Sequence, residues 1–280
     1  MGAFIELLKR PGRASVVWLD SHNYAGRLLA GGAPPWLDVA AFVAWQRKAQ
    51  GLLKSNVASL PVAPVVAAWL ETRPDLREAM GAKTRAVYPL KVLLADEMLR
   101  EHLVEMARGL RSAVGGLLAL ALPSPRAWVA LAYRQGHGKK VEVGEDEADS
   151  ASVYVADFLR AFGEVGFDAV LLQEASEDQP ASAEDLRACQ AVYNVAVHYK
   201  WDVGLQLPRP VAFSGAAPTD LAFVVAVDRV FDGLPNGIAL AHDFWNGAEP
   251  PAVRGVDFHF AEIPENAIPE RVLERLASLA

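Results

Sequence analysis

Short hydrophobic runs alternate with longer amphipathic stretches along most of the chain. The runs are continuous rather than alternating in polarity, as in Val16-Val17-Trp18-Leu19, which is typical of strands buried on both faces. Seven passages are predicted to contain such strands, at residues 16–20, 56–62, 116–123, 166–174, 202–208, 237–243 and 255–262.

Between these runs the apolar residues follow a helical period. The spacing predicts helices over 37–53, 151–165, 183–200 and 268–279, and over 219–227 near the end of the chain. A long helical region is predicted over about 65–110, interrupted by Pro74 and Pro89. Ser124-Pro125 predicts an N-cap followed by proline in the first helical turn. The acidic run within 136–150 is interpreted as a solvated loop.

This order of elements favours an α/β protein with a parallel sheet. Seven strands separated mostly by helices, with no Gly-x-Gly-x-x-Gly after any strand, predict a (β/α)8 TIM-type barrel in a single domain over residues 1–280. The eighth strand is not located, so the pattern allows a modified or incomplete ring. An open doubly wound sheet is the alternative.

Ionisable and polar residues follow several of the predicted strands, and in a barrel the carboxyl ends of the strands form the active-site face. Because an ionisable group at the edge of an apolar core has a perturbed pKa, we predict Asp20, Glu174 and His242 as catalytic residues. The predicted substrate-binding residues are His22, Tyr24, Arg27, Arg126, Gln206 and His259. Each has a structural alternative: Asp20 could cap a turn, Glu174 and His22 could be solvated loop side chains, and His259 could be a hydrogen-bonded core histidine.

The segment Arg134 to Lys140 could present backbone amides and positive charge to an anion, although a flexible surface loop is the simpler interpretation. Metal-binding spacings such as His-Glu-x-x-His or Cys-x-x-Cys do not occur, and no cofactor is predicted. A composite cation site from Asp20, Glu174, His242 and His259 is geometrically conceivable. The single cysteine, Cys189, excludes an internal disulfide and is interpreted as a small buried residue.

Composition narrows the choice of partners. Twenty-seven basic against 34 acidic residues give a formal charge of −7, which argues against binding to nucleic acid or to an anionic membrane surface. The first ten residues have a glutamate inside their apolar run and basic residues after it, the reverse of a secretory signal. We therefore expect a cytoplasmic protein whose partner is a small anionic metabolite, and the sequence leaves a homodimer open.

Three segments resemble the uroporphyrinogen decarboxylase superfamily, which includes the cobalamin-independent methionine synthases. Trp18 followed by Ala25-Gly26-Arg27 is similar to that family's opening segment, and the long helical region and the strand ending in Glu174 are similar to later parts. The resemblance implies a barrel, a site carboxylate at Glu174 and Arg27 as a ligand of substrate carboxylates. The decarboxylases have Met-Arg-Gln before the Ala-Gly-Arg, so their other arginine has no counterpart here, and one cysteine cannot form the methyl transferases' zinc site.

Three hypotheses for function follow. The first is a lyase, decarboxylase-like, in which Asp20 or Glu174 handles a proton, His242 is its partner, and Arg27 or Arg126 neutralises substrate carboxylate. The second is a metal-assisted transferase or hydrolase that uses the same acidic and imidazole side chains as ligands. The third is a non-catalytic barrel that binds a ligand or a partner protein.

Overall fold

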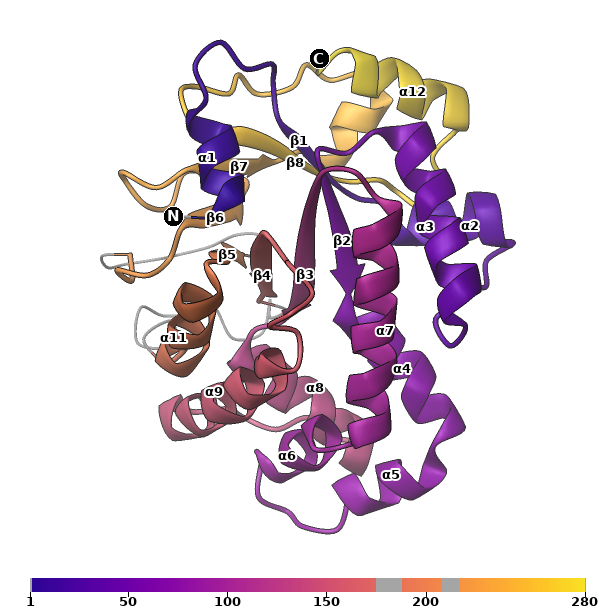
Figure 1. The fold of residues 1–280 in the computed structure, drawn as a ribbon, viewed down its shortest axis with the longest axis vertical. Helices are drawn as coiled ribbons and strands as arrows, with labels where there is room; N and C mark the ends of the chain where they lie inside the picture. The colour runs from indigo at the N-terminus through magenta and orange to yellow at the C-terminus, as the bar shows by residue number, and fades with distance from the viewer. Residues whose placement is uncertain (1, 175–187, 208–216, 280) are drawn as a thin grey trace.

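The protein is an eight-stranded parallel barrel surrounded by helices (Figure 1). The computed structural model describes residues 2–174, 188–207 and 217–279. Strand order follows chain order, and the ring closes where β1 pairs with β8, with Val17 opposite His259 and Asp20 opposite Glu262. The strands are β1 (Val17–Asp20), β2 (Val57–Pro61), β3 (Leu117–Pro123), β4 (Ala169–Gln173), β5 (Asp202–Gln206), β6 (Phe223–Ala226), β7 (Asn236–Ala239) and β8 (Phe258–Glu262). The (β/α)8 prediction is confirmed.

The strand missing from the sequence-based ring is β6. Its residues were predicted to be helical, which is wrong, because a short apolar run such as Phe223-Val224-Val225-Ala226 fits both periods and only its pairing with β5 and β7 decides. The acidic run was also misassigned, since Glu145, Asp146 and Glu147 form the first turn of α9 (Glu145–Arg160). Carboxylates in a first turn are favoured by the helix dipole.

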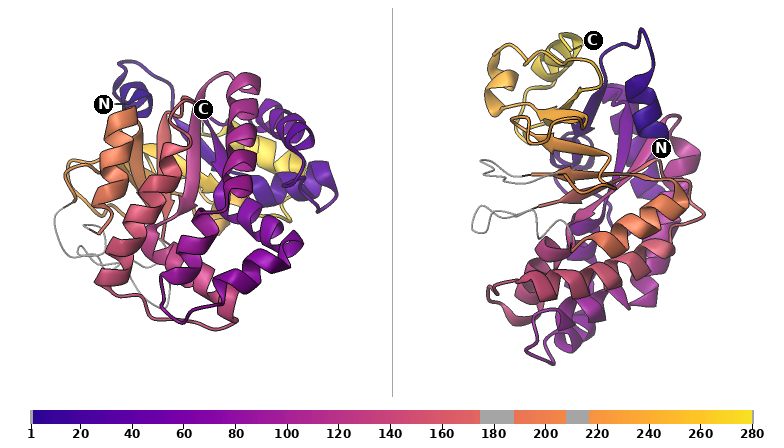
Figure 2. Two further views of the ribbon diagram at one scale, coloured as in Figure 1. Left: turned by 60° about the horizontal axis from the view of Figure 1, so that its bottom comes forward. Right: turned by 90° about the vertical axis from the view of Figure 1, so that its left-hand side faces the viewer.

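The helices are distributed unevenly around the barrel. Four of them, α4 (Val62–Thr72), α5 (Pro74–Met80), α6 (Tyr88–Leu94) and α7 (Glu97–Ala113), connect β2 to β3, as the long helical region predicted. Figures 1 and 2 show that α4–α6, α8 and α9 form a large helical layer on one side of the barrel. The remaining helical segments of the described residues are α1 (Ala3–Lys9), α2 (His22–Ala30), α3 (Val39–Leu53), α8 (Pro125–His137), α11 (Gln190–Tyr199), η1 (His242–Asn246) and α12 (Pro269–Ala277). The first residues of the helix predicted over 183–200 lie outside the described part of the chain.

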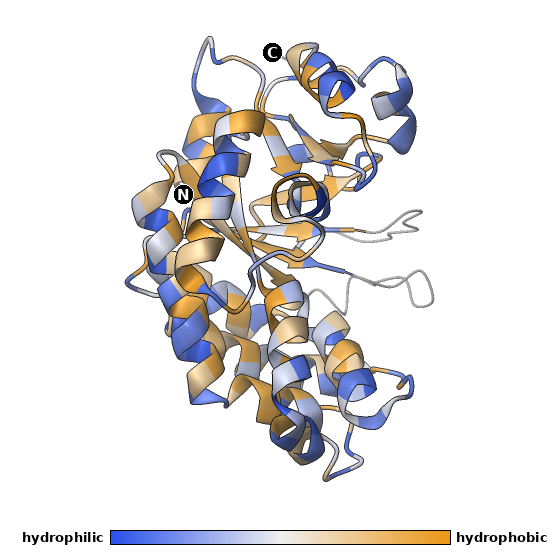
Figure 3. Ribbon diagram, turned by 90° about the vertical axis from the view of Figure 1, so that its right-hand side faces the viewer, coloured by the Kyte–Doolittle hydropathy of each residue, from blue (hydrophilic) through white to orange (hydrophobic). Residues whose placement is uncertain are grey.

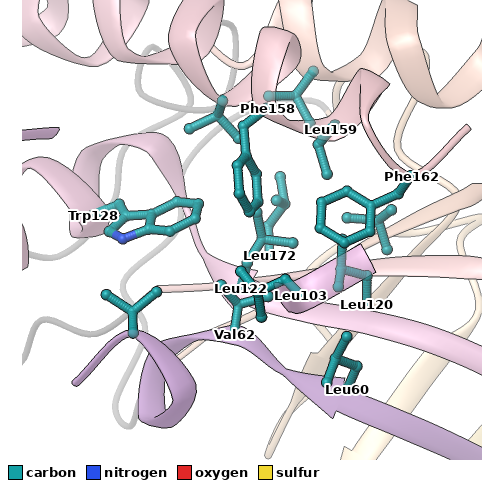
Figure 4. Packing of buried hydrophobic residues seen from close by; sticks show 14 of the residues in the cluster. Leu60, Val62, Leu103, Leu120, Leu122, Trp128, Phe158, Leu159, Phe162 and Leu172 are labelled. Atoms are coloured by element: carbon teal, nitrogen blue, oxygen red, sulfur yellow. The ribbon is translucent and has the colours of Figure 1, made fainter. Parts of the chain in front are cut away.

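Side chains alternate across the barrel wall, so that one set packs in an outer core beneath the helices and the other set fills the barrel interior. Figure 4 shows the outer core, where Leu120, Leu122 and Leu172 point away from the barrel axis and pack beneath Phe158 of α9 and Trp128 of α8. The neighbouring residues Ala119, Ala121 and Leu171 point into the barrel. Figure 3 shows hydrophobic strands between helices whose other faces carry hydrophilic residues.

The pole at which the strands begin, here called the N-terminal pole, is closed by α1. Phe4 is fully buried, and its ring centroid lies 4.8 Å from that of Phe223, 5.1 Å from Phe258 and 5.3 Å from Trp18. Gly204 makes room for this cluster, because a Cβ there would lie 2.0 Å from the Phe223 ring. Asp202 holds α1 in place by accepting hydrogen bonds from the backbone N–H of Gly2 (2.8 Å) and Ile5 (2.9 Å).

Within the described residues, no helix combines the length and the apolar composition needed to cross a bilayer.

Candidate functional site

Two adjoining cavities lie at the opposite pole, where the strands end. The large cavity, of about 780 Å³, lies over the ends of β3, β4 and β5 and is bounded by α8 and the segment from Lys140 to Val143. The small cavity, of about 200 Å³, lies over β1 and β2 and reaches into the barrel as far as Trp18. Gln173, the last residue of β4, lines both. Chemistry-bearing side chains from separate strands therefore converge at the C-terminal pole, as a barrel predicts.

Glu174 is the centre of a buried polar cluster beside the large cavity. Its Oε1 accepts a hydrogen bond from the Ser124 hydroxyl, and its Oε2 lies 2.9 Å from an Arg126 guanidinium nitrogen. The side chains of Arg126 and Glu174 are 8% and 3% exposed, so the ion pair is almost completely removed from water. Breaking such a pair would leave a buried charge, which makes the two residues structurally interdependent.

The local sequence explains how this cluster forms. Ser124 directly follows β3 and caps α8 by accepting a hydrogen bond from the Ala127 N–H (3.2 Å), and Pro125 occupies the first helical position, as predicted. The amino end of α8 thus lies beside the Glu174 carboxylate, and its dipole favours negative charge there. The N–H of Glu174 is held by the carbonyl of Gln206 (2.9 Å), which extends the β4–β5 pairing by one residue.

The small cavity contains a carboxylate–imidazole pair. His22 Nδ1 lies 2.9 Å from Asp20 Oδ1, and His22 Nε2 lies 3.3 Å from the backbone oxygen of Ser59. Both ring nitrogens face oxygen acceptors, so the ring satisfies both contacts when it is protonated on each nitrogen. Burial raises the pKa of Asp20, but the hydrogen bonds and charge of His22 outweigh burial and lower that pKa below its ordinary value. Asp20 is thereby held as a carboxylate.

A second carboxyl group, Glu262, ends the neighbouring strand β8. Its Cα is paired in register with that of Asp20, and it has the same parity along β8 as the inward-facing Phe258 and Phe260. Burial, and then the negative charge of Asp20, raise the pKa of Glu262. Two neighbouring carboxyl groups with pKa values displaced in opposite directions are a pattern found at proton-transfer sites.

Polar amides connect the two cavities. Gln173 Nε2 donates to Gln206 Oε1 at 3.0 Å, and both residues line the large cavity. In the small cavity, Trp18 Nε1 donates to the Ser59 hydroxyl at 2.9 Å. These groups offer hydrogen bonds in otherwise apolar walls, which is the usual composition of a small-molecule site.

The structure brings five of the predicted site residues to these cavities. Asp20 and His22 line the small cavity, and Glu174, Arg126 and Gln206 line the large one. His242 lies at the C-terminal pole but is exposed in η1 and lines neither cavity.

The other three predicted residues lie elsewhere. Tyr24 is buried among Leu53, Leu240 and Trp245, and burial, with a smaller effect of the Glu270 charge, raises its pKa. Arg27 is on the surface and donates to Asn266. His259 occupies the beginning of β8, with the opposite parity to its inward-facing neighbours, and its Nε2 lies 2.9 Å from the Pro251 carbonyl oxygen. The alternation of Phe258, His259 and Phe260 was the sequence signal that His259 points to the outside of the barrel wall while both phenylalanines point inward.

Sequence reasoning did not select several other lining residues. Ser59 sits in the middle of β2, where no local pattern distinguishes an inward serine. Gln173 immediately precedes Glu174, and the ionisable carboxylate was the stronger catalytic candidate of the two. Arg134 and Lys140 also line the large cavity. They belong to the basic segment for which the sequence allowed anion binding, although a surface loop was the simpler interpretation.

Among residues 2–174, 188–207 and 217–279, no group of three or more His, Cys, Asp or Glu side chains has the proximity that a metal site requires. The composite site conceived from Asp20, Glu174, His242 and His259 is therefore not assembled.

Comparison with known proteins gives no relative for this chain: no protein-family model matches it, and neither curated proteins nor solved structures match it significantly.

Proposed function

We propose that this protein is an enzyme that acts on an anionic metabolite by general acid–base chemistry at the C-terminal pole of the barrel. One observation carries the proposal: an ion-paired arginine and a carboxylate–imidazole pair line two adjoining cavities that share Gln173. A substrate held in the large cavity can extend a reacting group toward His22.

The charge of the large cavity supports an anionic substrate. Among the described lining residues, three cations (Arg126, Arg134 and Lys140) stand against two carboxylates (Glu142 and Glu174). The chain as a whole carries a formal charge of −7, so a locally positive cavity is a departure from its average. Arginine is well suited to carboxylates and phosphates because its guanidinium donates two parallel hydrogen bonds.

His22 is the proposed proton donor and Asp20 its orienting partner. Asp20 fixes the orientation of the ring through Nδ1, while the ring faces a cavity that reaches into the barrel. Glu174 is held by Ser124 and Arg126, so we assign it the positioning of Arg126 rather than proton transfer. His22 thus replaces His242 in the predicted carboxylate–imidazole pair, and it, rather than Asp20 or Glu174, is the group to which we assign proton transfer.

The reaction class that we propose is carbon–carbon cleavage such as decarboxylation, in keeping with the resemblance to the uroporphyrinogen decarboxylase superfamily. The bond to the carboxylate breaks, carbon dioxide leaves, and the electron pair stays on the substrate carbon, which takes the proton from His22. A proton from water then restores the imidazolium. This chemistry needs no oxidant or reductant.

The test begins with a panel of carboxylic acids scored by the rise in the thermal unfolding midpoint. Acids that bind are then assayed for carbon dioxide release by the wild-type protein and by His22→Gln. Because general acid catalysis contributes on the order of 10²–10⁴-fold, we expect His22→Gln to lose at least about 100-fold in rate.

His198→Gln is the matched control, since His198 is exposed on α11 at a distance in the fold from both cavities, and it should retain full activity. Binding of an acid without turnover would contradict the enzymatic proposal and support a ligand-binding barrel. Full activity of His22→Gln would contradict the assignment of the proton donor.

A further inference from the structure

The large cavity has apolar walls between two polar ends. The walls come from α4, α8 and the segment that follows α8, and they carry short aliphatic side chains: Ala63, Ala127, Ala130, Leu131, Val141 and Val143. Ala127, Ala130 and Leu131 are spaced by three and four residues, so they share one face of α8. A fully solvated metabolite gains little from such walls, whereas a hydrocarbon segment gains burial.

The inner polar end consists of the Arg126–Glu174 pair with Gln173 and Gln206, at the first turn of α8. The outer polar end is marked by Arg134, in the last turn of the same helix. Arg126 and Arg134 are separated by eight positions, which at 1.5 Å per residue is about 12 Å along the helix axis. Both ends of one helix thus present a guanidinium to one cavity.

Arg134 has no structural task that would account for it. Its side chain is exposed, and in the part of the chain that the structure describes its guanidinium forms neither an ion pair nor a hydrogen bond. A cation of this kind at the rim of an apolar cavity is available to an anionic ligand.

We infer that the ligand of the large cavity is an elongated anion with an apolar middle: one carboxylate lies at the inner end near Gln173 and Arg126, and a second anionic group reaches Arg134. The volume of about 780 Å³ supports a medium-sized ligand, because drug-sized molecules occupy pockets of about 300–1,000 Å³. This inference rests on the proposed function for the site, and it adds the substrate class.

Calorimetric titration of the full chain with butanedioate, hexanedioate, octanedioate and decanedioate tests the inference. Each added methylene buried along α8 should strengthen binding about fourfold until the second carboxylate reaches Arg134. Octanoate, which has the chain but no second carboxylate, should bind more weakly than octanedioate.

Two variants locate the ends and the walls. Arg134→Gln should weaken the longest dicarboxylate that binds well about tenfold and leave octanoate unchanged, and Arg134→Lys should restore part of that loss. Ala130→Leu narrows the cavity and should weaken the long diacids more than butanedioate. Arg47→Gln, which changes an exposed arginine on α3 away from the cavity, should have no effect.

An affinity that does not depend on chain length, an equal effect of Arg134→Gln on octanoate and on the diacids, or no binding of any diacid would overturn the inference. These results are distinguishable from failure of the proposed function. If diacids bind as expected but nothing is turned over, the enzymatic proposal fails and the ligand class stands. If another acid releases carbon dioxide while the diacids do not bind, the reverse holds.

Discussion

The two poles of this barrel use the same strands for different purposes. At the N-terminal pole, α1 inserts Phe4 among Trp18, Phe223 and Phe258, and Asp202 caps that helix through backbone hydrogen bonds. At the C-terminal pole, the interior is hollow and its ionisable groups contact other side chains, as in the Arg126–Glu174 and Asp20–His22 pairs. A carboxylate that is satisfied by backbone belongs to the fold, whereas one paired with side chains around a cavity is positioned for a ligand.

The largest expected effect is at the N-terminal pole. Phe4→Ala removes a fully buried ring from an aromatic cluster and should lower the free energy of unfolding by about 4 kcal/mol, measured by urea denaturation. Glu6→Ala, at an exposed position of the same helix, should change it by less than about 0.5 kcal/mol. Acid binding by the folded fraction should be unchanged in both variants. Loss of binding in Phe4→Ala would contradict the conclusion that the N-terminal pole stabilises the fold and takes no part in ligand binding.

At the C-terminal pole, Glu174→Gln should lower the free energy of unfolding by about 3 kcal/mol, because Arg126 loses its countercharge while buried. It should also weaken acid binding, because Glu174 positions Arg126 beside the large cavity. The double variant Glu174→Met with Arg126→Met should recover most of the stability, since two apolar side chains leave no charge uncompensated. It should not recover binding. A double variant that still binds acids as the wild type does would show that the pair has no part in the site.

Removal of the α1 cap should have an intermediate effect. Asp202→Ala leaves the Gly2 and Ile5 N–H groups without their acceptor and should cost about 2 kcal/mol in urea unfolding. Asp202→Asn keeps an acceptor oxygen and should cost less. Equal losses in the two variants would argue that the charge, and not the hydrogen bonds, holds α1.

The smallest effects distinguish the poles by the sign of their pH dependence. Burial raises the pKa of Asp202, although the N–H groups of Ile5 and Gly2 oppose it. Its contribution to stability is therefore present below the ordinary aspartate pKa and is lost as pH rises through the raised value. Relative to wild type, Asp202→Asn should gain stability as pH rises through that range.

Asp20 should behave in the opposite way. Its pKa is lowered because His22 outweighs the effect of burial, so its contribution is present above the ordinary pKa and is lost as pH falls through the lowered value. Asp20→Asn should be less stable than wild type at neutral pH, and the difference should shrink in acid. Urea unfolding over a pH series measures the stability of each variant relative to wild type. If this difference changed with pH in the same direction for Asp202→Asn and Asp20→Asn, the contrast between the two poles would be contradicted.

Local patterns were sufficient for most of the barrel. Continuous apolar runs marked most of the strands, and Ser124 was readable as a helix cap, which the structure shows with a hydrogen bond from the Ala127 N–H. They were not sufficient for β6, whose few residues fit either period. They were not sufficient for α1 either, because nothing local indicates that this helix closes the barrel by pairing with Asp202, about 200 residues away in sequence.

The residues of the candidate site also divide into those that local sequence predicts and those that depend on tertiary structure. Strand ends selected Asp20 and Glu174, because a polar residue after an apolar run is visible in sequence. The partners of Glu174 depend on the register between β3 and β4, which places Ser124 beside it and is a tertiary property. Parity along a strand explains His259, whose neighbours Phe258 and Phe260 occupy the interior.

The most direct test is a histidine-resolved NMR titration of the ¹³C-labelled protein with the carboxylic acid that most raises its unfolding midpoint. The chain has six histidines, and His22 and His259 report on the small cavity and on the outer wall at the beginning of β8. We predict that the Cε1–H resonance of His22 shifts with saturation while that of His259 stays unchanged. A shift at His259 without one at His22, or no shift at His22 on saturation, would contradict a ligand site at the C-terminal pole.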